Sequence, residues 1–188
     1  MREFTAEDCV WLCEDNSIKN HAVVISPSAI PRYGQGHIFF CIGGEGAETN
    51  VGRYLAPLVS LSTGELCHVR CEDVLGALKP ELLPDEARLH LSQLRPADAL
   101  DLKTHTPEYS GYSFLPDGRY AAGVWLCSPQ EVWGYVQMQK DYQHRVLICD
   151  RDDFAVLEMV KGKLLYPDEQ ALLEFSKSQE SDGGMRMG

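Results

Sequence analysis

Continuous apolar segments in the first half of the chain predict a set of strands. Residues 21–26 are rich in β-branched side chains, and residues 37–42 form an unbroken apolar run that is typical of a central strand. Residues 57–61 and 65–70 flank a Ser-Thr-Gly sequence at 62–64, which predicts a hairpin with glycine at the turn. We therefore expect a sheet in this half.

Helical signals lie between and after these strands. Thr5 followed by Asp8 supplies a capping side chain and an acidic first turn, so we predict a short helix through Cys13. Residues 72–78 also begin with two acids and are predicted to be helical. A third helix is predicted from Pro84, because proline and acidic residues are favoured in a first helical turn.

The second half begins with a predicted hairpin and a helix. Residues 115–118 read Leu-Pro-Asp-Gly, a strong turn signal, so residues 112–114 and 119–126 are predicted to pair. Ser128 precedes a proline and, three positions later, a glutamate, which together predict the start of a helix. Apolar positions from Val132 onward then follow at helical spacing.

Two more strands and a last helix complete the pattern. Residues 145–149 and 154–160 are apolar runs on either side of an acidic turn at 150–153. A helix is predicted from Pro167, where proline is again followed by acids. Residues 177–188 are polar and glycine-rich, which predicts a mobile tail.

The order of these elements predicts the fold class. Hairpins and short helices occur without a regular strand–helix–strand repeat, so we predict an α+β fold with mixed, mostly antiparallel sheets and short helices. Residues 95–110 are polar and irregular, and they separate a half at 1–98 from a half at 108–176. One continuous domain is the alternative.

Composition adds an acidic bias that runs along the whole chain. The 188 residues include 28 Asp and Glu against 17 Lys and Arg, a net charge of −11, and successive thirds carry −3, −4 and −4. A dispersed negative charge repels nucleic acid and attracts basic surfaces, so we expect a basic protein partner and no direct nucleic-acid contact. The chain has neither a membrane-length apolar run nor the apolar region of a secretory signal, so we expect a cytoplasmic protein without a membrane.

The seven cysteines leave two interpretations open. Cys9 and Cys13 form a pair with three intervening residues, as do Cys67 and Cys71, and four thiolates are able to hold a tetrahedral zinc. Reduced, buried thiols are the interpretation we favour, because several cysteines lie inside apolar runs. The odd number fits a reducing compartment better than a disulfide framework. We therefore expect no cofactor.

Two acidic loops are the candidate contact sites. A glycine-rich loop carries Glu45 and Glu48, and it lacks the lysine and hydroxyl residue of a phosphate-binding loop. The turn between two predicted strands carries Asp150, Asp152 and Asp153. A hard-cation site is one interpretation of this turn, and a solvated turn is the other. We expect both loops to contact a basic partner.

No combination of residues in the sequence defines a catalytic site. The six histidines form no His-x-His or His-x3-His pair, and no Gly-x-Ser-x-Gly motif occurs. We expect a protein that is not an enzyme, with a small metal-assisted hydrolase built on the acidic turn as the alternative. Core and hairpin packing explains most of a cluster of aromatic residues, whose exposed members would anchor a protein interface. The cluster comprises Tyr109, Tyr112, Tyr120, Trp125, Trp133 and Tyr135.

Residues 36–44 (GHIFFCIGG), 115–120 (LPDGRY) and 143–154 (QHRVLICDRDDF) carry a family resemblance that covers most of residues 20–170. They resemble accessory proteins of conjugative and other mobile elements of gut Firmicutes. Some small acidic proteins of such elements are anti-CRISPR inhibitors of type II systems, so the resemblance implies a non-catalytic inhibitor of the RNA-guided nuclease. That nuclease holds nucleic acid in positively charged channels, which an acidic protein is suited to occupy. An antirestriction protein or another interaction module of a mobile element is the alternative.

Overall fold

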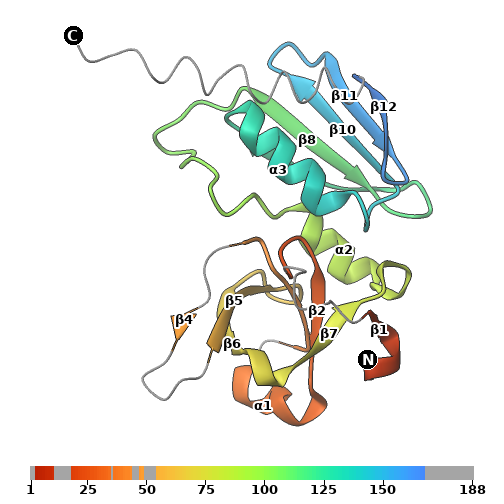
Figure 1. Ribbon diagram of the computed structural model, residues 1–188. Coiled ribbons are helices and arrows are strands. Elements are labelled where there is room, and N and C mark those ends of the chain that lie inside the picture. The colour runs from red at the N-terminus through yellow and green to blue at the C-terminus, as the bar shows by residue number, and fades with distance from the viewer. Residues whose placement is uncertain (1–2, 11–17, 35, 44–46, 49–53, 168–188) are drawn as a thin grey trace. The chain divides into compact units, whose positions relative to one another are not determined.

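The chain divides into two compact units, Met1–Ala97 and Asp98–Gly188, and the division falls within the polar segment 95–110 (Figure 1). Each unit contains an antiparallel sheet with short helices, so the α+β prediction is confirmed. All of the described strand pairs are antiparallel. The computed structural model describes residues 3–10, 18–34, 36–43, 47–48 and 54–167.

The first unit is built on a seven-stranded sheet. Its strands are β1 (Cys9–Val10), β2 (Ala22–Ile25), β3 (Ile38–Phe40), β4 (Ala47–Glu48), β5 (Tyr54–Ser60), β6 (Leu66–Arg70) and β7 (Val74–Leu78). They pair in the order β1-β7-β2-β3-β5-β4, and β6 pairs with β5. The strands predicted at 21–26 and 37–42 and the predicted hairpin are therefore present as β2, β3, β5 and β6.

Short helices accompany this sheet. They are α1 (Ile30–Tyr33), α2 (Asp85–Ser92) and the 3-10 helices Ala6–Asp8, Pro27–Ala29, Cys71–Asp73 and Pro80–Leu82. Helix α2 confirms the helix predicted from Pro84. Apolar side chains of β2, β3, β5 and β6 form a buried cluster that includes Val23, Phe39, Leu58 and Val69.

Two predicted helices of this unit are wrong. Residues 72–78 were predicted to be helical, but they contain the end of a 3-10 helix followed by β7, which pairs with β1 on one side and β2 on the other. The predicted helix from Thr5 contains one 3-10 turn, and the chain becomes β1 at Cys9. Both segments gain hydrogen bonds from distant strands, which local sequence signals do not report.

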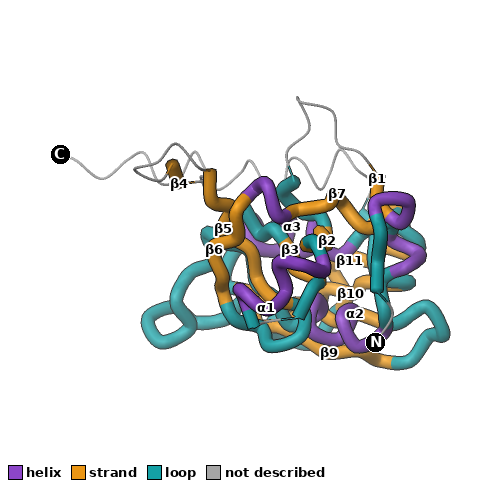
Figure 2. Tube along the Cα trace, turned by 90° about the horizontal axis from the view of Figure 1, so that it is seen from below, coloured by secondary structure: helices purple, strands orange, loops and turns teal. Residues whose placement is uncertain are grey.

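The second unit is a five-stranded sheet with one helix. Its elements are β8 (Tyr109–Phe114), β9 (Tyr120–Leu126), α3 (Pro129–Gln139), β10 (Arg145–Asp150), β11 (Ala155–Val160) and β12 (Lys163–Tyr166). The strands pair in the order β12-β11-β10-β8-β9. Figure 1 shows α3 lying across one face of this sheet, and Figure 2 views the same strands along another direction.

The predicted helix start and its apolar face are confirmed in α3. Ser128 Oγ accepts a hydrogen bond from the Glu131 backbone amide at 3.2 Å, which caps the helix. Val132, Tyr135 and Val136 are buried against a cluster that the strands supply. These apolar side chains recur at the helical spacing that the sequence indicates. The helix therefore turns one apolar side to the sheet and covers one face of it.

The last two predicted segments fall outside the described part of the chain. The helix predicted from Pro167 and the predicted tail at 177–188 lie outside the described residues, which end at 167. Within the described part of the chain, no helix has the length and apolar composition that crossing a bilayer requires.

Candidate functional site

The acidic turn between β10 and β11 is the best-defined candidate site. The Asp150 carboxylate accepts hydrogen bonds from the backbone amides of Asp152 at 3.0 Å and Phe154 at 2.9 Å. The Asp150 amide donates to the Phe154 carbonyl at 2.9 Å, and Asp153 adopts a left-handed backbone conformation with φ of 66°. Aspartate is well suited to both positions, because its short side chain bonds nearby amides and tolerates positive φ.

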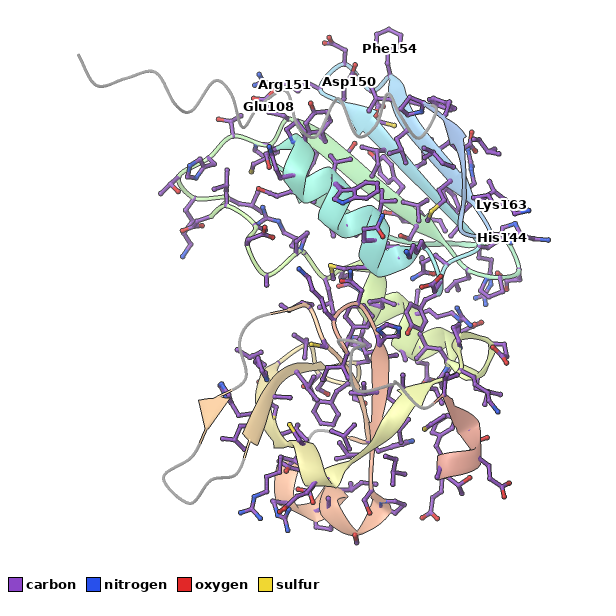
Figure 3. All side chains as sticks on the ribbon, in the orientation of Figure 1. Glu108, His144, Asp150, Arg151, Phe154 and Lys163 are labelled. Carbon is purple, nitrogen blue, oxygen red and sulfur yellow. The ribbon has the colours of Figure 1, made fainter. Side chains whose placement is uncertain are left out.

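This turn presents an apolar ring together with negative charge. Phe154 is 70% exposed, and Asp152 and Asp153 are both exposed beside it. Figure 3 shows Phe154 projecting away from the strands at this end of the unit, whereas His144 and Lys163 lie at the opposite end. A large exposed apolar side chain next to two exposed carboxylates has features of a protein-binding surface.

An ion pair borders the turn on the side of β8. The Arg151 guanidinium lies 3.3 Å from the Glu108 carboxylate, and both side chains are about half exposed. Glu108 precedes β8, which pairs with β10 so that Tyr109 lies opposite Asp150. Burial raises the pKa of Tyr109, and the Glu108 and Asp150 charges raise it further. The Glu108 and Asp150 carboxylates therefore both lie close enough to Tyr109 to affect its pKa.

The geometry separates the three aspartates predicted to form one site. Asp150 Oδ1 accepts both amide hydrogen bonds of the turn, so this carboxylate helps to hold the loop in shape, and its contact with a partner stays a prediction. Asp152 and Asp153 carry the exposed carboxylates. Sequence reasoning assigned Phe154 to a strand and missed its exposure, although an apolar residue directly after an aspartate-rich turn was the available signal.

The second acidic loop is described only in part. Glu45 lies outside the described residues. The backbone of Glu48 belongs to β4, where it pairs with Tyr54 of β5. The prediction that Glu45 and Glu48 contact a partner stays a prediction.

The structure places the cysteines of the predicted zinc pairs on separate elements. Cys9 is buried in β1, Cys67 lies in β6, and Cys71 is exposed in the following 3-10 helix, whereas Cys13 is outside the described residues. Strands β7, β2, β3 and β5 lie between β1 and β6 in the sheet. Among the described residues, no three His, Cys, Asp or Glu side chains form a group able to hold a metal ion.

Four cysteines, three of them buried and Cys67 partly buried, have thiols whose raised pKa favours the protonated form. Burial is the main cause that raises the pKa of Cys9, Cys41, Cys67 and Cys149. Because the thiolate is the nucleophile and the metal ligand, a raised pKa disfavours both roles. These cysteines therefore act as small apolar side chains in their surroundings.

The first unit contains a small cavity of about 290 Å³. Phe4, His37, Leu61 and His90 are among its lining residues, and the His37 ring packs against Phe4 with 5.4 Å between centroids. Ligand pockets typically have volumes of about 300–1,000 Å³, so this cavity has room for a small molecule at most. The exposed acidic turn therefore remains the stronger candidate.

Exposed aromatic side chains occur at a second place in the second unit. Tyr120 and Trp125 of β9 are 57% and 59% exposed, whereas Tyr135 of the same predicted cluster is fully buried. The Tyr120 ring packs against Tyr112 and Phe114, with centroid separations of 6.3 and 6.0 Å. The predicted split between core and exposed aromatics is thus present, with the exposed members on β9.

Comparison with known proteins assigns no function to these features. No family model, curated protein or solved structure matches this chain significantly. The functional interpretation therefore depends on the geometry of the acidic turn, the charge of the chain and the helices and strands that position the turn. The turn offers exposed carboxylates and one aromatic ring, which suits binding to a basic surface.

Proposed function

We propose that this protein acts without catalysis, by binding a basic protein that handles nucleic acid. The most specific form of the proposal is an anti-CRISPR inhibitor that binds the type II RNA-guided nuclease. The observation that carries the proposal is the acidic turn, where Phe154 is 70% exposed directly after the exposed residues Asp152 and Asp153. The resemblance of residues 143–154 to mobile-element proteins is the reason for choosing this nuclease as the partner.

The turn has the chemical parts that a protein interface uses. A phenyl ring that enters a pocket on the partner supplies apolar burial at the centre of the contact. Asp152 and Asp153 supply charge at its edge, where carboxylates attract lysine and arginine and raise the association rate. Asp150 already fixes the turn through two hydrogen bonds, so little conformational freedom is lost on binding.

A basic protein fits this surface better than nucleic acid does. Exposed carboxylates repel phosphates, and the chain carries a net charge of −11. The RNA-guided nuclease presents positively charged channels and reads its adjacent motif with arginine side chains. An acidic protein that occupies these surfaces would exclude target DNA from them.

Removing the two exposed charges tests the site. We expect the Asp152→Asn/Asp153→Asn variant to bind the nuclease about tenfold more weakly, mostly through slower association at low salt. Asparagine tolerates positive φ, so the turn geometry at Asp153 is kept. Titration of the labelled protein into guide-loaded nuclease measures affinity, and a target-DNA cleavage assay measures inhibition.

A matched variant separates this site from the overall charge. Asp98→Asn/Asp141→Asn removes the same charge from two other exposed positions of the second unit and should bind within about twofold of the native chain. Phe154→Ala should weaken binding by about tenfold or more, because it removes the central apolar contact. Equal losses in the two double variants would contradict the site. Native protein that neither binds the nuclease nor protects target DNA would contradict the anti-CRISPR form.

A further inference from the structure

The cavity in the first unit takes its walls from four segments that are far apart in the sequence. Phe4 precedes the 3-10 helix Ala6–Asp8, His37 precedes β3, Leu61 follows β5, and Glu86 lies in α2. All of these residues belong to the first unit, whereas the acidic turn belongs to the second. The cavity is therefore a separate candidate site, and the proposed function does not use it.

Hydrogen bonds hold the walls of this cavity in place. The Leu61 amide donates to the Ile38 carbonyl at 3.0 Å, which joins two of the lining segments. In α2, the buried Arg88 side chain donates to the carbonyls of Pro80 at 2.7 Å and Leu83 at 3.1 Å, which ties the helix to the segment before it. Because the walls are already fixed, a ligand that binds there costs little conformational freedom.

The buried part of the wall is apolar and aromatic. Phe4 and Leu61 are 3% and 2% exposed, and the buried His37 ring packs against Phe4. The cavity volume of about 290 Å³ is roughly twice that of an engineered apolar cavity of about 150 Å³ that binds benzene. The cavity therefore has room for a bicyclic ring such as indole with a short side chain.

The exposed lining residues Ser62 and Glu86 form a polar rim. His90 lies four residues after Glu86 in α2, so the two side chains share one side of the helix. Among the described lining residues, Glu86 alone carries a formal charge when histidine is counted as neutral. Its carboxylate attracts an ammonium group and repels carboxylates and phosphates, and the net charge of −11 acts in the same direction.

We propose that this cavity binds a small aromatic amine, with the ring against Phe4 and His37 and the ammonium group at the rim beside Glu86. Burial of the ring supplies the apolar part of the affinity. The Ser62 hydroxyl and the His90 imidazole are able to accept a hydrogen bond from an N–H group of the ring. The volume thus sets the size of the ligand, and the rim sets its charge.

Three probes that share an indole ring test this charge preference. Tryptamine ends in an ammonium group, 3-indolepropionate ends in a carboxylate on the same two-carbon linker, and indole has neither. In titrations of the ¹⁵N-labelled native chain at low salt, tryptamine should bind with a Kd of about 1 mM or lower. It should bind at least about fivefold more tightly than 3-indolepropionate, with indole between them. The amide signals of His37, Ser62 and Ala87 should shift, and that of Ile148 in the second unit should not.

Variants of α2 locate the site. Glu86→Gln keeps the size of the side chain and should weaken tryptamine binding about threefold without changing indole binding. Glu81→Gln is the matched control, because it removes the same charge from an exposed residue that does not line the cavity, and it should leave all three affinities unchanged. Ala87→Leu adds volume at a buried lining position and should weaken all three probes by about tenfold.

These measurements are independent of binding to the nuclease, so the two proposals can fail separately. A native chain that binds none of the probes at millimolar concentration would overturn the inference. So would 3-indolepropionate or indole binding as tightly as tryptamine, or equal losses of tryptamine affinity in the Glu86→Gln and Glu81→Gln chains. A folded Ala87→Leu chain with native affinity for tryptamine would place the ligand elsewhere and would also overturn it.

Discussion

Glu131 illustrates how one side chain holds two segments of the second unit together. The sequence predicts it as the third residue of a capping motif, and its amide does bond Ser128. Its carboxylate, however, is buried and accepts hydrogen bonds from the amides of Cys127 and Leu100, each at 3.0 Å. It thus fastens the segment before β8 to the start of α3.

Replacing Glu131 should therefore destabilise the second unit. We expect Glu131→Ala to lower the free energy of unfolding by about 2–3 kcal/mol, because the Cys127 and Leu100 amides lose a charged acceptor. Gln137→Ala on the same helix is the control and should change stability by less than about 0.5 kcal/mol. Urea unfolding measures both, and faster exchange of the Leu100 amide would report the released segment. An unchanged Leu100 amide would contradict this role.

Asp73 plays a comparable part in the first unit. Its carboxylate accepts a hydrogen bond from the Tyr33 hydroxyl at 2.6 Å and pairs with Arg32. The Tyr33 hydroxyl in turn accepts from the Arg70 amide at 3.0 Å. Burial alone would raise the pKa of Asp73, but the hydrogen bonds from Tyr33 and Arg32 and the charges of Arg32 and Arg70 outweigh it, so the pKa lies below its usual value.

This lowered pKa predicts how stability depends on pH. The stabilisation is complete above the unfolded-state pKa of about 4, and it is lost as pH falls through the lower pKa of the folded state. Asp73→Asn should lower the free energy of unfolding by about 1–3 kcal/mol at pH 7. The gap between variant and native chain should narrow below about pH 4. Urea unfolding at several pH values checks this, and a gap that stays constant down to pH 2 would contradict it.

At the scale of elements, packing partners decided the secondary structure of segments whose sequence pattern was ambiguous. Residues 74–78 carry small and apolar side chains that suit a helix or a strand equally. They form β7 because β1 and β2 supply partners on both sides. A side chain at Gly76 would lie 3.0 Å from the Cys9 Cβ, so the close approach of β1 requires glycine there.

Helix α3 and β8 meet at a similar close contact. A Cβ atom on Gly111 would lie 2.9 Å from Cε1 of Tyr135. The Tyr135 ring is fully buried, and its hydroxyl is 2.7 Å from Ser113 Oγ, so the ring has little freedom to move. Burial also raises the pKa of Tyr135, which keeps the hydroxyl neutral.

Gly111→Ala should therefore cost stability through overpacking. We expect a loss of about 1–3 kcal/mol in the free energy of unfolding. In a Tyr135→Leu background the same change should cost less, because the clashing ring atoms are absent. Chemical denaturation of the four chains gives the coupling between the two positions. Additive effects would show that the clash is not the cause.

At the scale of the molecule, charge is shared between units that fold around separate sheets. The first unit carries a net charge of −5 and the second −6. The surplus is therefore a property of both units. The charge of the whole chain is one reason for proposing a basic partner, and the proposed contact depends on where the second unit exposes Phe154.

The sequence by itself determined the local elements and the chemical character of the surface. Continuous apolar runs predicted β2, β3 and β10, turn residues predicted the hairpins, and Ser128 predicted the start of α3, because these signals act over a few residues. Only the tertiary structure decided that residues 74–78 are a strand, that Glu131 fastens a distant segment, and that Phe154 and Trp125 are exposed. The strand and the Glu131 contacts depend on partners that are distant in the chain. The exposure of Phe154 and Trp125 depends on whether other segments cover them, and local sequence patterns do not predict either.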